Sequence, residues 1–210
     1  MTRAFTLAEV LITFAIIGVV AALTIPTLIS NNNKRIVETR LAKFYSTINQ
    51  AIELSEVENG PKEKWDLIPN NSQEAIAWFN KYLKPYIIAS KTDYSDNEKV
   101  LVYYSDGSML SFNRSGWDFF PKASDYNKTG PKNGIKNFIF LFSPASTSNN
   151  YKYHTGKGVE PYMYSWNGTE THLRNNATYG CNNDNYVRAF CTQLIRINGW
   201  KIPDDYPFKF

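Results

Sequence analysis

The feature that most constrains this chain is an apolar segment at its N-terminus. Residues 5–29 are apolar, small or hydroxyl-bearing, with the single exception of Glu9. As a helix, this segment is about 37 Å long at 1.5 Å per residue, whereas a bilayer core is about 30 Å thick. Arg3 precedes the segment, and Lys34 and Arg35 follow it. The pattern predicts one membrane-spanning helix.

A cleaved secretory signal does not fit this segment. Signal peptides have a shorter apolar region that is followed by a small-residue cleavage site. Here the apolar run is longer, and it continues directly into a helical pattern. An uncleaved signal anchor fits the length and the flanking charges, but it leaves Glu9 unexplained.

Glu9 needs an explanation because acidic residues in a lipid-facing helix are unfavourable, by about 2.5–3.5 kcal/mol at the centre and by less near an end. In one interpretation, Glu9 lies among the lipid headgroups and is favoured by the dipole at the helix N-terminus. In the other, it meets a positive charge at the same depth. The segment contains no Lys or Arg. The remaining partner is an α-amino group, released by cleavage before Phe5 and carried by a neighbouring copy.

The sequence around Glu9 resembles a known signal. Residues 4–12 (AFTLAEVLI) and 15–22 (AIIGVVAA) are similar to the class III signal of type IV pilins and type II secretion pseudopilins. The resemblance implies that a prepilin peptidase cuts between Ala4 and Phe5 and methylates the new amine. It also implies that Glu9 pairs with the N-terminus of an adjacent subunit during filament assembly. Ala4 departs from the family, which usually has Gly before the cut.

The resemblance implies a domain organisation and a function. Residues 1–4 would be a leader peptide, residues 5–30 a transmembrane and assembly helix, and residues 31–210 an extracytoplasmic head. The protein would be a structural subunit and not an enzyme, located in the bacterial inner membrane and then in a periplasmic or extracellular filament. Its partners would be copies of itself or other pilins, the prepilin peptidase, the inner-membrane assembly platform and membrane lipid.

A second hypothesis belongs to a different class. The same segment would also suit a single-pass, membrane-anchored extracytoplasmic domain that binds a ligand or catalyses a reaction. The two hypotheses differ at the Ala4–Phe5 junction, because an anchored domain keeps its leader.

The helix is expected to continue beyond the membrane. Apolar residues recur at helical spacing after the span, with polar residues between them; they are Val37, Leu41, Phe44, Ile48, Ala51 and Ile52. This helix should run to about Val57, because Asn59-Gly60-Pro61 is a stop signal. Pro26 matches the family's helix-weakening proline, and Pro26 and Gly18 predict a kink or local melting.

The rest of the chain predicts a small α+β head. We expect a helix from Ser72, as its N-cap, to Pro85. Residues 99–112 predict a β-hairpin that turns at Asp106-Gly107. Residues 137–142 predict a buried strand, residues 144–176 long loops with room for one short hairpin, and residues 185–197 a helix capped by Gly199. The expected fold class is pilin-like: a long N-terminal helix packed on a small antiparallel sheet with short extra helices.

The two cysteines, Cys181 and Cys191, have two interpretations. In the cytosol they would be buried thiols, and outside it they would be a disulfide that closes a short loop. The N-terminus places the head outside the cytoplasm, and the resemblance implies the same pairing, because pilin-like proteins often bridge a C-terminal loop. A disulfide is therefore expected.

Few residues in the head suggest a catalytic or metal-binding site. Neither His154 nor His172 has metal-ligand spacing, and both are expected in exposed loops. Asp93, Asp96 and Glu98 group hard oxygen ligands that Ca²⁺ prefers, but they lack EF-hand spacing, and a solvated turn is the alternative. No other cofactor is expected. The net charge of +4 is scattered, without a Lys/Arg block, so no nucleic-acid partner is expected.

Overall fold

The computed structural model describes residues 6–95, 98–114, 116–126 and 134–210. The cleavage-site residues Ala4 and Phe5, and Asp96 of the acidic cluster, lie outside the described residues. The α-helices are α1 Leu7–Asn59, α2 Ser72–Tyr82, α3 Glu170–Asn175 and α4 Cys191–Ile197. The strands are β1 Lys91–Asp93, β2 Val100–Tyr103, β3 Met109–Asn113, β4 Gly116–Phe120, β5 Phe138–Phe142 and β6 Val159–Pro161.

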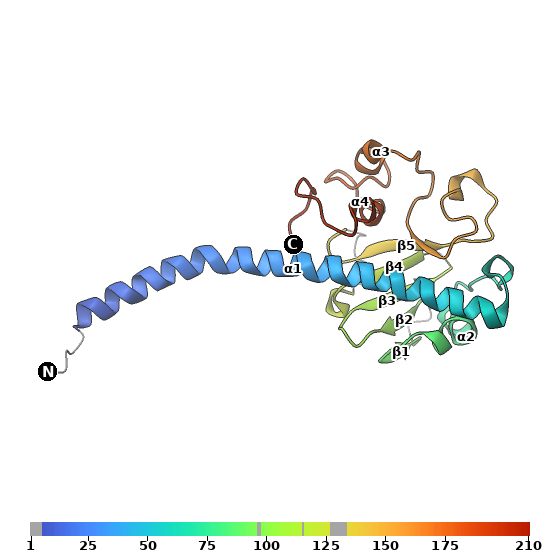
Figure 1. Cartoon of the computed structure of the whole chain (residues 1–210), viewed down its shortest axis with the longest axis horizontal. Coiled ribbons are helices and arrows are strands. Elements are labelled where there is room, and N and C mark those ends of the chain that lie inside the picture. The colour runs from blue at the N-terminus through green and yellow to red at the C-terminus, as the bar shows by residue number, and fades with distance from the viewer. Residues whose placement is uncertain (1–5, 96–97, 115, 127–133) are drawn as a thin grey trace.

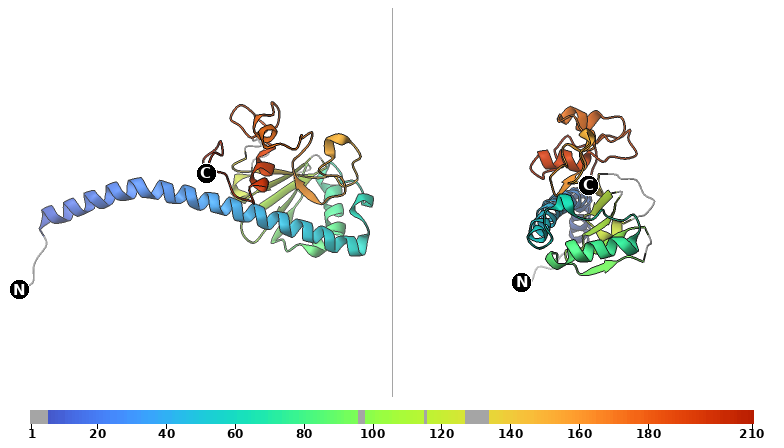
Figure 2. Two further views of the ribbon diagram at one scale, coloured as in Figure 1. Left: turned by 45° about the horizontal axis from the view of Figure 1, so that its top comes forward. Right: turned by 90° about the vertical axis from the view of Figure 1, so that its right-hand side faces the viewer.

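The fold is α+β and pilin-like, as the sequence predicts. The N-terminal half of α1 extends away from the rest of the molecule, and its C-terminal half lies across the sheet (Figure 1). Strands β1 to β6 form one antiparallel sheet in which each strand pairs with its neighbour in sequence. Viewed along the long helix, α1 lies at one side of the head, with α2 and the α3–α4 region on either side of α1 (Figure 2).

The packed half of α1 is explained by its apolar spacing. All six predicted stripe residues are buried, together with Glu38 and Ser55. Phe44 lies at the centre of this face: its ring stacks on Phe119 of β4 at 4.4 Å and meets Phe140 of β5 edge-on at 5.0 Å. The helix ends at Asn59, where Gly60 adopts a φ of +74°. The predicted stripe and stop signal are both confirmed.

Helix α1 continues through Gly18 and Pro26 without interruption. Figure 1 shows the helix as a curved rod along its projecting half. Proline removes one backbone hydrogen bond and crowds the preceding turn, which favours bending over a straight axis.

The predicted hairpin is confirmed, with a longer turn than the Asp106-Gly107 pair suggests. Strands β2 and β3 pair from Val100 to Tyr103, and the turn comprises Ser105, Asp106 and Gly107. The Gly107 N–H donates to the Tyr104 carbonyl at 3.1 Å, and Gly107 has a φ of +81°. This is the three-residue hairpin loop in which a glycine takes the left-handed position.

Three strands were not predicted from the sequence. Strands β1 and β6 have only three residues each. Strand β4 contains Asp118, a residue type that strands usually exclude. Here the Asp118 carboxylate is buried and accepts from the Lys99 ammonium at 2.7 Å, so the charge is compensated inside the sheet.

Two helix boundaries differ from the prediction. The N-cap of α2 is Asn71, not Ser72: the Asn71 side chain accepts from the Glu74 N–H at 2.8 Å, and Ser72 instead donates to the Tyr94 carbonyl. Helix α4 begins at Cys191, not at residue 185. Its predicted first turn is a loop, because Asn185 donates its side-chain amide to the carbonyls of Asn176 and Gly180. Gly199 follows α4 at a φ of +66°, as predicted.

Candidate membrane and assembly site

The projecting half of α1 is apolar and uncovered. It forms part of a helix that is long and apolar enough to cross a membrane, and none of its most apolar 18-residue window is buried by the head. Large side chains are exposed on every side of it. A helix that is apolar all round needs an apolar surrounding, either lipid or other helices. This half of α1 is the candidate functional surface of the molecule.

Glu9 lies in the first turn of α1, where it forms a capping box with Thr6. The Thr6 hydroxyl accepts from the Glu9 N–H at 3.3 Å, and Glu9 Oε2 accepts from the Thr6 N–H at 2.8 Å and from its hydroxyl at 2.9 Å. This arrangement satisfies two of the free N–H groups at the helix start. Sequence reasoning missed it, although Thr6-Leu7-Ala8-Glu9 has the T-x-x-E spacing of a capping box.

Only one carboxylate oxygen of Glu9 is used in this way. Both hydrogen bonds from Thr6 reach Oε2, and within the described residues no donor reaches Oε1. A carboxylate has lone pairs on both oxygens. Glu9 therefore keeps the capacity to accept from a group outside its own chain.

The packed half of α1 is tied to the head through Tyr45, whose hydroxyl contacts both members of an ion pair between β6 and α4. Glu160 of β6 forms an ion pair with the Arg196 guanidinium of α4 at 2.8 Å, and its other oxygen accepts from the Tyr45 hydroxyl of α1 at 3.0 Å. Arg196 also donates to the Tyr45 hydroxyl at 2.8 Å. Burial, and then the Glu160 charge, raise the pKa of Tyr45 to about 12. Burial also raises the pKa of Glu160, despite the nearby Arg196.

A second tie joins α1 to the backbone of β6. The Asn49 side chain donates to the Val159 carbonyl at 2.9 Å and accepts from the Val159 N–H at 2.9 Å. Asn49 thereby acts on this sheet edge as a further strand would. Gly158 is required beside it, because a Cβ there would lie 2.0 Å from the Asn49 side-chain oxygen.

A third tie joins α1 to the C-terminal tail, at the end of the head nearest the projecting half (Figure 1). The buried Glu38 carboxylate accepts from the Lys201 ammonium at 3.0 Å and from the Ile202 N–H at 2.9 Å. Lys34 forms an ion pair with Asp204 at 3.5 Å. Together, the three ties fix the direction in which the projecting half leaves the head.

The predicted disulfide is present. Cys181 and Cys191 are bridged, and both are buried. The bridge connects the loop that follows α3 to the first residue of α4. It therefore holds in place the α4 segment that carries Arg196.

Of the three predicted calcium ligands, the structure describes Asp93 and Glu98. Asp93 accepts from the Ser95 N–H and hydroxyl, and its other oxygen pairs with Lys91 at 3.0 Å. The Ser95 N–H, its hydroxyl and the Lys91 ammonium hold the pKa of Asp93 well below its usual range. Glu98 is exposed, and among the described residues no group of three or more acidic, His or Cys side chains could hold a metal ion.

The prediction of two exposed histidines is wrong for His154. This side chain is fully buried, and its Nε2 accepts from the Met163 N–H at 3.1 Å. Burial, with Lys157 and Arg196 nearby, lowers the pKa of His154 to about 4. His172 is half-buried, and its Nδ1 accepts from the Asn167 N–H at 3.2 Å.

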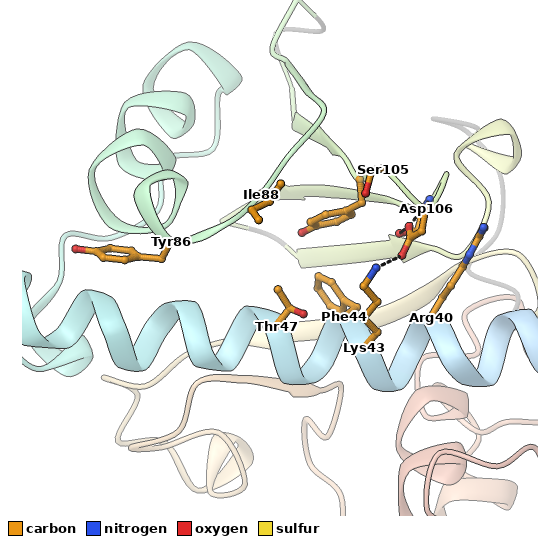
Figure 3. A pocket seen from close by; sticks show the side chains of 10 residues that line it. Arg40, Lys43, Phe44, Thr47, Tyr86, Ile88, Ser105 and Asp106 are labelled. Carbon is orange, nitrogen blue, oxygen red and sulfur yellow. Dashed lines mark hydrogen bonds and ion pairs between the residues drawn. The ribbon is translucent and has the colours of Figure 1, made fainter.

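A hollow of about 320 Å³ lies between α1 and the β2–β3 turn (Figure 3). Its one carboxylate belongs to Asp106, which accepts from the Lys43 ammonium at 2.9 Å and from the Ser108 hydroxyl at 2.6 Å. Burial alone would raise the pKa of Asp106, but these donors outweigh it and lower the pKa to about 2. The rest of the lining is mainly apolar, aromatic or hydroxyl-bearing, and includes Phe44 and Ile88.

Comparison with known proteins places the chain in a family without identifying an activity. No curated protein and no solved structure matches the chain. One family model matches residues 27–210, which comprise the packed half of α1 and the whole head. The chain therefore belongs to the family described as a family of unknown function (DUF6613).

Proposed function

We propose that the protein is a structural subunit of a pilus-like filament, either a type IV pilin or a type II secretion pseudopilin. One observation carries the proposal: half of α1 is packed on the head, and the other half is apolar, uncovered and carries Glu9 in its first turn. The class III-like residues 4–12 surround that carboxylate.

The two halves suit two successive environments. In the inner membrane, lipid covers the projecting half of α1, and the head lies on the extracytoplasmic side. On leaving the lipid, the same surface must be covered again, because large exposed apolar surfaces are unfavourable in water. Parallel copies of the helix provide that cover. The apolar half would then form the core of a filament and the heads its outer layer.

Glu9 has a defined role in this proposal. Its Oε1 has no donor within the described residues, so it can accept from the methylated α-amine of Phe5 in a neighbouring copy. A charge pair in an apolar surrounding is much stronger than one in water. The pair would favour the axial position at which the amine and the carboxylate meet.

A second function is favoured by the capping box. Thr6 gives Glu9 a partner within its own chain, so the carboxylate has a role even without assembly. This observation suits a membrane-anchored extracytoplasmic domain that keeps its leader. Such a domain would use the head, and α1 would be only an anchor.

Intact-mass analysis of the protein from membranes separates the two functions. A filament subunit should begin at Phe5, carry one N-methyl group, and retain residues 1–4 when the peptidase is absent. The matched control is the variant Ala4→Gly, which has the residue that is usual in the family before the cleavage site. The leader of this variant should be removed at least as completely as that of the unaltered chain. An intact leader in cells that contain the peptidase would contradict the proposal.

A further inference from the structure

The packed half of α1 has an outer face that the head does not cover. Seen along the helix, this side of α1 faces away from the sheet (Figure 2). Seven exposed residues follow one another along it at intervals of three or four; this outer stripe consists of Arg35, Thr39, Lys43, Ser46, Gln50, Glu53 and Val57. Residues at such intervals share one side of a helix.

The two ends of the outer stripe carry opposite charges. Arg35 lies near the projecting half, and Glu53 lies near the far end of α1. They are 18 residues apart, which is five full turns and about 27 Å along the axis. Both side chains therefore point to the same side of the helix.

These two charges have no partner within the described part of the chain. No hydrogen bond or ion pair connects the side chain of Arg35 or Glu53 to a described residue. Nearby charges are already engaged: Lys43 pairs with Asp106, and Glu58 accepts from the Tyr86 hydroxyl. Arg35 and Glu53 are thus the free charges of the outer stripe.

The middle of the outer stripe permits another helix to approach. Between the two free charges, Thr39, Ser46 and Gln50 are uncharged, and Lys43 is drawn toward the β2–β3 turn by Asp106. Thr39 and Ser46 have short side chains, which allow helix axes to come close. The stripe therefore combines an approachable middle with charged ends.

Entry into a filament from one membrane gives all copies the same direction. Their α1 helices must run parallel. At equal height, Arg35 would face Arg35 and Glu53 would face Glu53, and like charges at short range repel. A shift of about 27 Å along the helix places Arg35 of one copy opposite Glu53 of the other.

We propose that the outer stripe is a contact surface for a second copy of this chain, packed parallel and displaced by about 27 Å, with Arg35 of one copy against Glu53 of the other. The contact rests on the proposed filament function and adds a specific interface to it. Each pair leaves one Arg35 and one Glu53 unused, so the contact repeats. A contact of this type generates an open stack instead of a closed dimer.

Charge reversal tests the contact in the full-length chain, expressed with its assembly machinery. Arg35→Glu and Glu53→Arg should each lower the yield of sheared filaments at least about fivefold, because each replaces an attraction with a repulsion. The double variant should recover most of the yield. Matched controls are Glu74→Arg and Lys84→Glu, which reverse exposed charges outside the outer stripe and should leave the yield unchanged.

Cross-linking tests the displacement itself. In the double variant Arg35→Cys/Glu53→Cys, a short bismaleimide should produce a ladder of multimers, because the native cysteines are bridged. Arg35→Cys alone should give no cross-link. Cross-linking of Arg35→Cys to itself would show equal height and overturn the inference, as would normal filament yield in both single reversals. If the unaltered chain forms no filaments, the proposed function fails and the inference fails with it.

Discussion

The two halves of α1 belong to one continuous helix, yet they differ in what surrounds them. In the packed half, only one face is apolar, and six apolar residues are buried against the head. In the projecting half, apolar residues occur on all sides, and the head buries none of the most apolar window. The head covers the apolar face of the packed half, whereas the projecting half must be covered by lipid or by other helices.

The contrast extends to the polar residues of each half. Glu38, Tyr45 and Asn49 of the packed half are bonded to residues far away in the sequence, in the C-terminal tail and in β6. In the projecting half, the side chains of Glu9 and Thr6 form hydrogen bonds only between these two residues, within the described part of the chain. Substitutions in the packed half should therefore change the stability of the head, and substitutions in the projecting half should change assembly.

The largest effect is expected from Glu9→Leu. This change removes a carboxylate from an apolar segment, so membrane insertion should be unchanged or improved. The head should unfold at the same temperature, since Glu9 makes no contact with the described residues of the head. Filament yield should nevertheless fall by more than about tenfold, because the pairing with a neighbour's amine is lost. The measurement is sheared-filament yield at equal membrane level.

Two matched variants sharpen this experiment. Glu9→Asp keeps the charge on a shorter arm and should assemble at an intermediate level. Thr6→Val removes the capping hydroxyl and leaves Glu9 in place, so it separates the capping box from the assembly role. Normal assembly by Glu9→Leu, or an equal loss in Thr6→Val, would mean that Glu9 acts only within its own helix.

The second prediction concerns the packed half. Arg196→Met leaves the Glu160 carboxylate buried without its cation, which should lower the free energy of unfolding by about 3–4 kcal/mol. All five tryptophans lie at or after residue 65, so their fluorescence reports unfolding of the head in detergent.

The matched control is the double variant Arg196→Met/Glu160→Met. Removing both charges avoids the uncompensated carboxylate, and it should recover most of the lost stability. If the double variant is as unstable as Arg196→Met, the loss comes from packing around Tyr45 and not from the ion pair.

Local patterns in the sequence were sufficient to predict much of the fold. The buried stripe from Val37 to Ile52 follows from helical spacing, and the β2–β3 hairpin follows from two apolar runs around a glycine turn. The helix stop at Gly60 has the same kind of local signal. In each case, residues close together in the sequence determine the local structure.

The missed features depend on residues that are distant in sequence. Strand β4 contains Asp118, and its charge is acceptable only because Lys99 lies beside it in the sheet. The contact between Glu38 and Lys201 crosses almost the whole chain. No local pattern indicates these pairs. The capping box of Thr6 and Glu9 is different, since its T-x-x-E spacing is a local pattern that the sequence contains.

The third prediction concerns the disulfide. Loop-closure entropy gives the Cys181–Cys191 bridge a stabilising effect of about 2.5–3 kcal/mol. The double variant Cys181→Ala/Cys191→Ala should lose that amount in a denaturant titration, with α1 insertion unaffected. Labelling of either thiol in the native chain without prior reduction would contradict the bridge.

The smallest effect is expected from pH, acting through His154. Its pKa is about 4 in the folded head, compared with about 6.5 in an unfolded chain. Above pH 6.5, both states hold the neutral ring, and stability does not depend on this residue. Between pH 6.5 and 4, the unfolded chain binds a proton that the folded head does not. Stability should therefore fall as the pH falls, by about 2 kcal/mol between pH 8 and pH 5.

Other groups titrate in the same range, so the test requires a matched variant. Glu160 has a raised pKa, and its protonation acts in the opposite direction, favouring the folded head as the pH falls. His154→Gln keeps an acceptor for the Met163 N–H but does not titrate. The difference between the two chains isolates the histidine: unaltered protein should lose about 2 kcal/mol more than His154→Gln between pH 8 and 5. Equal losses would show that His154 is protonated as readily in the folded head as in the unfolded chain. Since Arg196 both pairs with Glu160 and lowers the pKa of His154, the same experiment in Arg196→Met should show a smaller difference.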